Sequence, residues 1–259
     1  MAAQLTWNFS HYNRNVALSV LVPLLLSLGA GFDTSEKEAA LGAHLAAQME
    51  RETTPLGFTD VDKYVAAVGR RIAAQIPGDL LIWTFRVIRD QRGGSLCEPL
   101  SLPGGYIFVP VRLIVAAQNE DEFAGMLAHA MAHAAARHGM RMASRGEIAS
   151  LATVPLIFMG GAFGDESAVV PRAYAETRRQ FELDADQIAA KTLAAAGYDP
   201  QALLRFVSRR QPQDSVRIAN LERAMQDLPA PTENMPSGTF DRIRSECRQT
   251  SAPVPSLLR

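Results

Sequence analysis

Cysteine is scarce in this sequence, which has two in 259 residues, Cys97 and Cys247. Neither belongs to a CxxC pair, which argues against a zinc site built from cysteines. The two are far apart in the chain and could form one disulfide in an oxidising compartment. Their spacing does not decide whether the two Cα atoms come within bridging range, so pairing stays open.

An excess of charge of one sign is also missing. The chain has 26 basic and 27 acidic residues, a net charge of −1. This balance provides no electrostatic footprint for nucleic acid, and we expect no nucleic-acid partner. Hydrophobic residues make up 47% of the chain, which is enough for one sizeable core.

No hydrophobic run is long enough to span a bilayer, which takes about 20 residues. The apolar stretch at residues 16–30 is shorter, and Pro23 interrupts it. It fits the apolar region of a signal peptide, with small residues at 29–31 for cleavage. We therefore expect residues 1–31 to be a signal peptide or N-terminal membrane segment and residues 32–259 to form the folded domain. The protein would be exported, periplasmic or membrane-associated in a bacterium.

The remaining pattern is mostly helical, with a few strand-like segments. Spacing of apolar residues and capping residues predict an α+β fold, predominantly helical, with a small sheet placed before a histidine-bearing helix. Pro110 ends the second strand-like segment and lacks an amide donor, so that strand should lie at a sheet edge or stop there. The predicted helices are residues 33–53, 59–76, 119–139, 174–197 and 200–210, and the predicted strands lie within 78–90 and 102–111.

Chemistry concentrates in "LAHAMAHAAARHG", residues 127–139, which holds His129 and His133. Residues four apart share one face of a helix, so the two imidazoles can meet one metal ion. Such a pair also arises by chance, and a third ligand is needed to strengthen the prediction of a metal site. Glu182 is the candidate, and Asp186, one turn later, can accept the free ring N–H of a ligand histidine.

Two neighbouring residues are given no role at the ion. His138 lies five residues after His133, a spacing that turns it away from the metal on a continuous helix, so we expect it to be structural. Asp184 lies between Glu182 and Asp186 and should point to solvent.

Three ordered segments resemble a family of zinc peptidases. They are "LPGGYIFV", "LAHAMAHAAARHG" and "FELDADQIAAKTLAAAGYDP". The family includes the CAAX prenyl endopeptidase, the HtpX-like heat-shock membrane protease and periplasmic outer-membrane quality-control peptidases. The resemblance implies a gluzincin-like metallopeptidase domain that holds one zinc ion through His129, His133 and Glu182. It also implies a sheet whose edge strand lies beside the zinc helix.

Ala130 departs from this family at the position of the general-base Glu of HExxH. A methyl group cannot move a proton, so we expect a zinc-dependent metalloendopeptidase of extended or misfolded polypeptides in an inactive form. An engineered Glu→Ala change and a natural pseudo-enzyme both fit, and the intact remainder of the helix favours the engineered change. The alternative function is a non-catalytic zinc-binding chaperone or adaptor.

Two other segments depart from the family as well. Members often carry a His-Pro segment before a final Arg-Ile helix, and the matching stretch at residues 234–246 has no histidine. "CEPLSLPGG", residues 97–105, replaces an Asn-Ala-Phe-type segment.

Substrate binding is expected at a strand close to the zinc helix. An extended polypeptide would add to it as one more strand, and membrane association of the protein is also open. The residues assigned to this substrate strand are Gly104, Gly105, Tyr106, Ile107, Phe108 and Val109.

Overall fold

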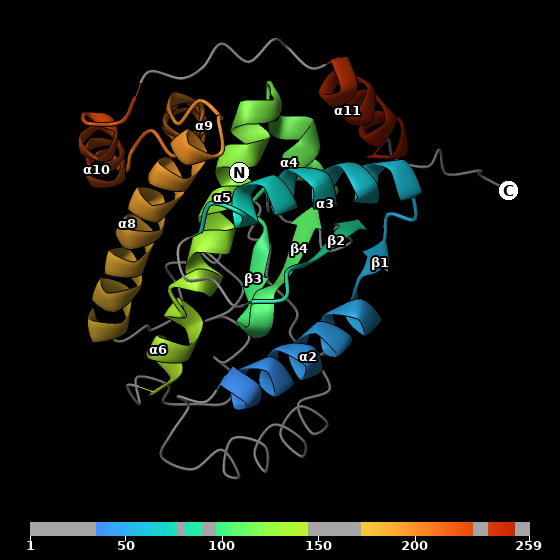
Figure 1. The fold of residues 1–259 in the computed structure, drawn as a ribbon, viewed down its shortest axis with the longest axis horizontal. Helices are drawn as coiled ribbons and strands as arrows, with labels where there is room; N and C mark the ends of the chain where they lie inside the picture. Colours follow the sequence, from blue (N-terminus) through green and yellow to red (C-terminus); the bar gives the residue numbers. More distant parts are fainter. Residues whose placement is uncertain (1–34, 77–80, 90–96, 145–171, 230–237, 252–259) are drawn as a thin grey trace, which may run out of the picture.

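A computed structural model describes residues 35–76, 81–89, 97–144, 172–229 and 238–251 (Figure 1). The predicted leader, residues 1–31, lies outside these ranges. The helices are α2 (Ser35–Glu52), α3 (Thr59–Ala73), α4 (Val111–Ala116), α5 (Glu120–Ala135), α6 (His138–Ser144), α8 (Arg172–Ala195), α9 (Gln201–Arg210), α10 (Ser215–Met225) and α11 (Gly238–Ser251). The strands are β1 (Thr54–Pro55), β2 (Thr84–Arg89), β3 (Leu100–Leu102) and β4 (Tyr106–Pro110), and a short 3₁₀ turn, η2, spans Pro103–Gly105. The predicted fold class, mostly helical with a small sheet, is confirmed.

The sheet has the strand order β1-β2-β4-β3, with β2 and β4 parallel and the other pairs antiparallel. The prediction that residues 106–109 form an edge strand is therefore wrong. Leu100 pairs with Phe108 and Leu102 with Tyr106, so β3 covers the side of β4 that was expected to be free. The edge strand that packs against α5 is β3 itself. As expected, β4 ends at Pro110.

The turn between β3 and β4 depends on glycine. Gly104 and Gly105 have φ values of +75° and +88°, which residues with a Cβ rarely adopt. This turn also packs against α2, because a Cβ on Gly42 would lie 1.9 Å from the carbonyl oxygen of Pro103. The Pro-Gly-Gly segment thus joins the β3–β4 hairpin to the first described helix.

The core lies between the sheet, α3 and α5. Helix α3 has an apolar stripe at helical spacing, Val61, Val65, Val68 and Ile72, which is buried and packs against the sheet. Helix α5 is apolar nearly all round because α3, α8 and α9 and the strands β3 and β4 all pack against it. A helix covered on most sides can bury a histidine such as His129, while His133 stays partly exposed, so the candidate site lies at the edge of the core.

Helices α5 and α8 run beside each other, with the sheet on the other side of α5 (Figure 1). Asn119, the first residue of the predicted helix 119–139, caps α5 by accepting a hydrogen bond from the Glu122 amide at 2.9 Å. Gly197, with φ +75°, follows α8, and the Tyr198 amide donates back to the Leu193 carbonyl at 2.9 Å. These two ends fix which turns of the helices face each other.

The described residues include both cysteines and the helices in which a membrane span could be sought. Cys97 and Cys247 form no disulfide with each other. None of the described helices combines the length and the apolar character that crossing a membrane requires.

Candidate metal centre

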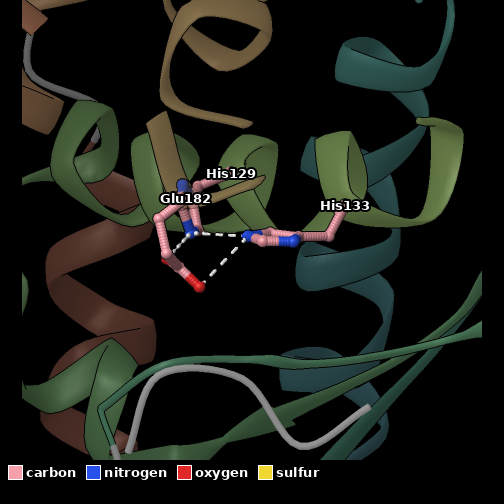
Figure 2. Close-up of side chains that lie close together, drawn as sticks. All are labelled: His129, His133 and Glu182. Atoms are coloured by element: carbon pink, nitrogen blue, oxygen red, sulfur yellow. Dashed lines mark hydrogen bonds and ion pairs between the residues drawn. The ribbon is translucent and has the colours of Figure 1, made fainter. Parts of the chain in front are cut away.

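Helices α5 and α8 bring His129, His133 and Glu182 together at the point where they pack (Figure 2). The His129 Nε2 atom lies 3.2 Å from His133 Nε2 and 3.3 Å from Glu182 Oε2. The distance from His133 Nε2 to Glu182 Oε1 is 3.7 Å. The three residues proposed from the sequence as metal ligands therefore converge, and among the described residues they form the one cluster suited to a metal ion.

The spacing of these atoms suits a tetrahedral ion. Two ligand atoms that each lie about 2.0–2.1 Å from one zinc ion in tetrahedral geometry are about 3.3 Å apart. The two nitrogens are 3.2 Å apart, Glu182 Oε2 lies 3.3 Å from His129 Nε2, and the other oxygen, Oε1, lies 3.7 Å from His133 Nε2, all close to that value. Two nitrogens and one carboxylate oxygen are also the donor set of many hydrolytic zinc sites. The residues present thus fit a metal ion that keeps one coordination position open.

Electrostatics favours the charged carboxylate in this cluster. Burial alone would favour the neutral acid, but the imidazoles of His133 and His129 hold the pKa of Glu182 well below its usual range. Burial likewise opposes protonation of His129, yet the adjacent Asp186 carboxylate raises the pKa of that ring to about 9. A basic imidazole beside a carboxylate anion is a strong pair of metal ligands.

His129 is supported from behind by a buried ion pair. Asp186, proposed from the sequence as the partner of a ligand histidine, places Oδ1 2.8 Å from the outer nitrogen Nδ1 of His129. Arg217 donates to both oxygens of that carboxylate, from Nε at 2.7 Å and from Nη2 at 2.9 Å. Nη2 also lies 3.4 and 3.5 Å from the two ring nitrogens of His129. The ring is therefore held between a carboxylate and a guanidinium.

His133 has a different neighbour. The Nδ1 atom of His138 lies 3.2 Å from His133 Nδ1, and the Nε2 atom of His138 lies 3.0 Å from Asp184 Oδ2. Burial and the nearby His133 ring lower the pKa of His138 to about 4, so this ring is neutral at pH 7. His138 does not face the ligand cluster directly, as expected, but it does contact one of the ligands. Asp184 is 47% exposed and also accepts from His138, so it is more than a solvated side chain.

Arg217 was not predicted from the sequence, because the Arg-Ile pair of the family was assigned to a different part of the chain. Arg242, in the stretch first assigned to the family's Arg-Ile helix, lies on α11 with its side chain 59% exposed, 3.9 Å from Asp60. The arginine that reaches the site is Arg217, which begins an Arg-Ile pair on α10, and a Gln-Pro pair, Gln211-Pro212, precedes it. The Arg-Ile pair is visible in "QPQDSVRI", but a Gln-Pro precedes it where a His-Pro was expected, so the pair was not recognised.

Ala130 is on α5 immediately after His129 and is buried, with 2% exposure. Its methyl group contributes no donor or acceptor to the centre. The chain therefore has the candidate ligands and their supports, while the residue that follows His129 has no group that could transfer a proton.

A histidine pair one turn apart on one helix, facing a carboxylate from a second helix, provides the donor set of a zinc hydrolase, as in zinc metallopeptidases. The sequence model of peptidase family M48 matches residues 59–226, more than half of the 259, and the chain belongs to this family. This confirms the resemblance drawn from the three sequence segments.

Individual relatives agree with this membership. The chain is 28% identical to the mitochondrial metalloendopeptidase OMA1 of Saccharomyces cerevisiae over 148 residues, 57% of this chain and 40% of the relative. It is 32% identical to OMA1 of Schizosaccharomyces pombe over 146 residues, 54% of this chain and 41% of the relative. It is 25% identical to the beta-barrel assembly-enhancing protease of Yersinia pestis over 188 residues, 67% of this chain and 37% of the relative. The chain thus spans about two fifths of these curated relatives.

Proposed function

We propose that this M48 domain binds one zinc ion through His129, His133 and Glu182, and that it is a metalloendopeptidase domain whose hydrolysis is disabled at Ala130. The observation that carries the metal is the convergence of three side chains whose nearest ligand atoms lie 3.2–3.7 Å apart, beside a buried Asp186–Arg217 pair. A bound zinc ion supplies Lewis acidity, which polarises a peptide carbonyl and lowers the pKa of water.

The missing step is a proton transfer. In the HExxH family pattern, the Glu takes a proton from the attacking water and passes it to the leaving amine. Positioned acid–base groups of this kind contribute about 10²–10⁴-fold in rate. Ala130 can accept no proton, so the chain retains the parts that bind and orient but has lost this one.

A polypeptide is the proposed partner, added to β3 instead of β4. β4 is paired on both sides, whereas β3 is the edge strand of the sheet and packs against α5, which bears both histidines. An extended peptide on that edge would gain backbone hydrogen bonds and pass close to the metal ligands. The apolar run at residues 16–30 supports an exported or membrane-associated location.

The second candidate is a natural, non-catalytic zinc-binding holder of polypeptides. Two further departures from the family pattern, Gln211 and Glu98, lie in contact beside the site. Gln211 accepts from Arg217 Nη1 at 3.0 Å and donates to Glu98 Oε1 at 3.1 Å. A single engineered change would leave these two positions untouched. Their alteration together with Ala130 favours a natural pseudo-enzyme over the engineered change that the sequence alone favoured.

The test restores the missing group. The variant Ala130→Glu and the size-matched Ala130→Gln are loaded with zinc, their metal content is measured by mass spectrometry, and hydrolysis of unfolded casein is followed. A disabled peptidase predicts that Ala130→Glu gains about 10²–10⁴-fold over both the unmodified chain and Ala130→Gln.

Two other outcomes lead elsewhere. A fully zinc-loaded Ala130→Glu variant that cleaves nothing contradicts the peptidase proposal. In that case, zinc-dependent suppression of casein aggregation by the unmodified chain would support the holder. Absence of stoichiometric zinc from all three proteins would rule out the metal site itself.

A further inference from the structure

We infer that His138 and Asp184 are positioning residues, which form a directed hydrogen-bond chain that holds His133 in its metal-binding orientation. The inference rests on the metal site proposed above and adds two residues that the sequence pattern had left without a role there. It follows from two distances, His133 Nδ1 to His138 Nδ1 at 3.2 Å and His138 Nε2 to Asp184 Oδ2 at 3.0 Å.

Donor and acceptor rules leave a single arrangement of protons in this chain. His133 turns Nε2 toward Glu182 and His129, so a metal takes that nitrogen and the proton sits on Nδ1. His133 Nδ1–H then donates to His138 Nδ1, which must accept. The proton of a neutral His138 ring is consequently on Nε2, and it donates to the Asp184 carboxylate. Each contact in the chain thereby determines the tautomer of the next ring.

His138 is fixed well enough to perform this role. Its ring is 2% exposed and stacks on Phe181, with ring centroids 4.4 Å apart and planes 8° apart. Arg141 lies over the Phe181 ring at 4.8 Å. These contacts hold the His138 ring in place even though its carboxylate partner is half exposed.

A backbone turn brings His138 back to His133. Helix α5 ends at Ala135, and Arg137 takes a positive φ of 55°, so the regular helical spacing is interrupted before α6 begins at His138. Glu38 of α2 accepts a hydrogen bond from Arg137 Nε at 2.6 Å and anchors this turn. On a continuous helix the two rings would not face each other.

A purely structural histidine would only fill space, and the two roles differ in a measurable way. His138→Phe retains an aromatic ring to stack on Phe181 but removes the acceptor for His133. Asp184→Ala removes the end of the chain at a half-exposed position where packing changes little. Glu176→Gln, an exposed carboxylate on the same helix α8, is the matched control.

Zinc affinity is measured for each protein by competition with a chromogenic chelator. Loss of an outer hydrogen-bond partner weakens metal binding about 10–100-fold. We expect His138→Phe near the upper end of that range, Asp184→Ala near the lower end, and Glu176→Gln equal to the unmodified chain. If His138→Phe does not fold, Asp184→Ala and the following measurement still decide the matter.

The second readout is the tautomer of each ring, from ¹⁵N shifts of labelled histidine in the zinc-loaded unmodified chain. The inference predicts a proton on Nδ1 of His133 and on Nε2 of His138. A proton on Nδ1 of His138, or zinc affinities of both variants equal to the control, would overturn it. If the unmodified chain binds no zinc, the proposed metal site itself is wrong. This outcome differs from one in which zinc binds but His138 and Asp184 do not affect it.

Discussion

The two histidines of the candidate site are supported in contrasting ways. Behind His129 lies a salt bridge shut away from water, in which the side chains of Asp186 and Arg217 are 0% and 5% exposed. Behind His133 lies a neutral ring, His138, whose partner Asp184 is 47% exposed. One support is charged and internal, and the other is neutral and reaches the surface.

The two supports therefore affect different properties: one affects the stability of the fold, and the other affects metal affinity. A buried carboxylate and a buried guanidinium each need the other, because an unpaired charge in the interior is strongly unfavourable. The support of His129 is therefore part of the folded core. A carboxylate open to water costs little when it loses its partner, so the support of His133 can change metal affinity without changing stability. Substitutions in the support of His129 and in the support of His133 both test this difference.

The largest effect is expected from Arg217→Met, which leaves Asp186 buried without its cation. Breaking a buried pair from one side costs about 3–5 kcal/mol, so the free energy of unfolding should fall by that amount. Urea denaturation with chelator present measures it without a contribution from metal. On the other support, Asp184→Ala should change the same quantity by less than about 0.5 kcal/mol.

A double variant checks the cause. Arg217→Met combined with Asp186→Leu removes both charges, and it should recover a large part of the loss, because the apolar replacement of a buried pair is often neutral. Stability that stays as low as in the single variant would show that packing, and not the unpaired charge, explains the Arg217 effect.

A smaller effect is expected from Asp186→Asn on metal binding. The amide retains an acceptor for His129 Nδ1 but loses the negative charge that makes the ring basic. Zinc affinity should fall about 100-fold, the upper end for an outer partner, and by more than in Asp184→Ala. Equal losses in chelator competition would show that burial and charge do not distinguish the two supports.

The part of the site that the sequence predicted is the part encoded by helical spacing. His129 and His133 are one turn apart, as are Glu182 and Asp186, so each pair shares a helix face whatever the rest of the fold does. That local rule was enough to propose the cluster. Its limit is visible at His138, because α5 ends at Ala135 and a positive φ at Arg137 interrupts the helical spacing.

The parts of the site that the sequence did not predict depend on contacts between residues that are far apart in the chain. Arg217 is 88 residues from His129, and no local pattern connects them. β3 has only three residues, too few to show a strand pattern, so β4 was expected to have a free side. Its pairing with β4 became visible only in the three-dimensional register.

A smaller loss of stability than that of Arg217→Met is expected at the anchor of the Arg137 turn. Glu38 is buried, but its partner Arg137 has a side chain 34% exposed and can be solvated when the carboxylate is removed. Glu38→Ala should therefore lower the free energy of unfolding by about 1–2 kcal/mol, less than Arg217→Met. The control on the same helix is Glu50→Ala, whose pair with Arg86 is half exposed and should contribute under about 1 kcal/mol. A Glu38→Ala loss as large as that of Arg217→Met would mean that the surroundings of His133 are as deeply tied to folding as those of His129.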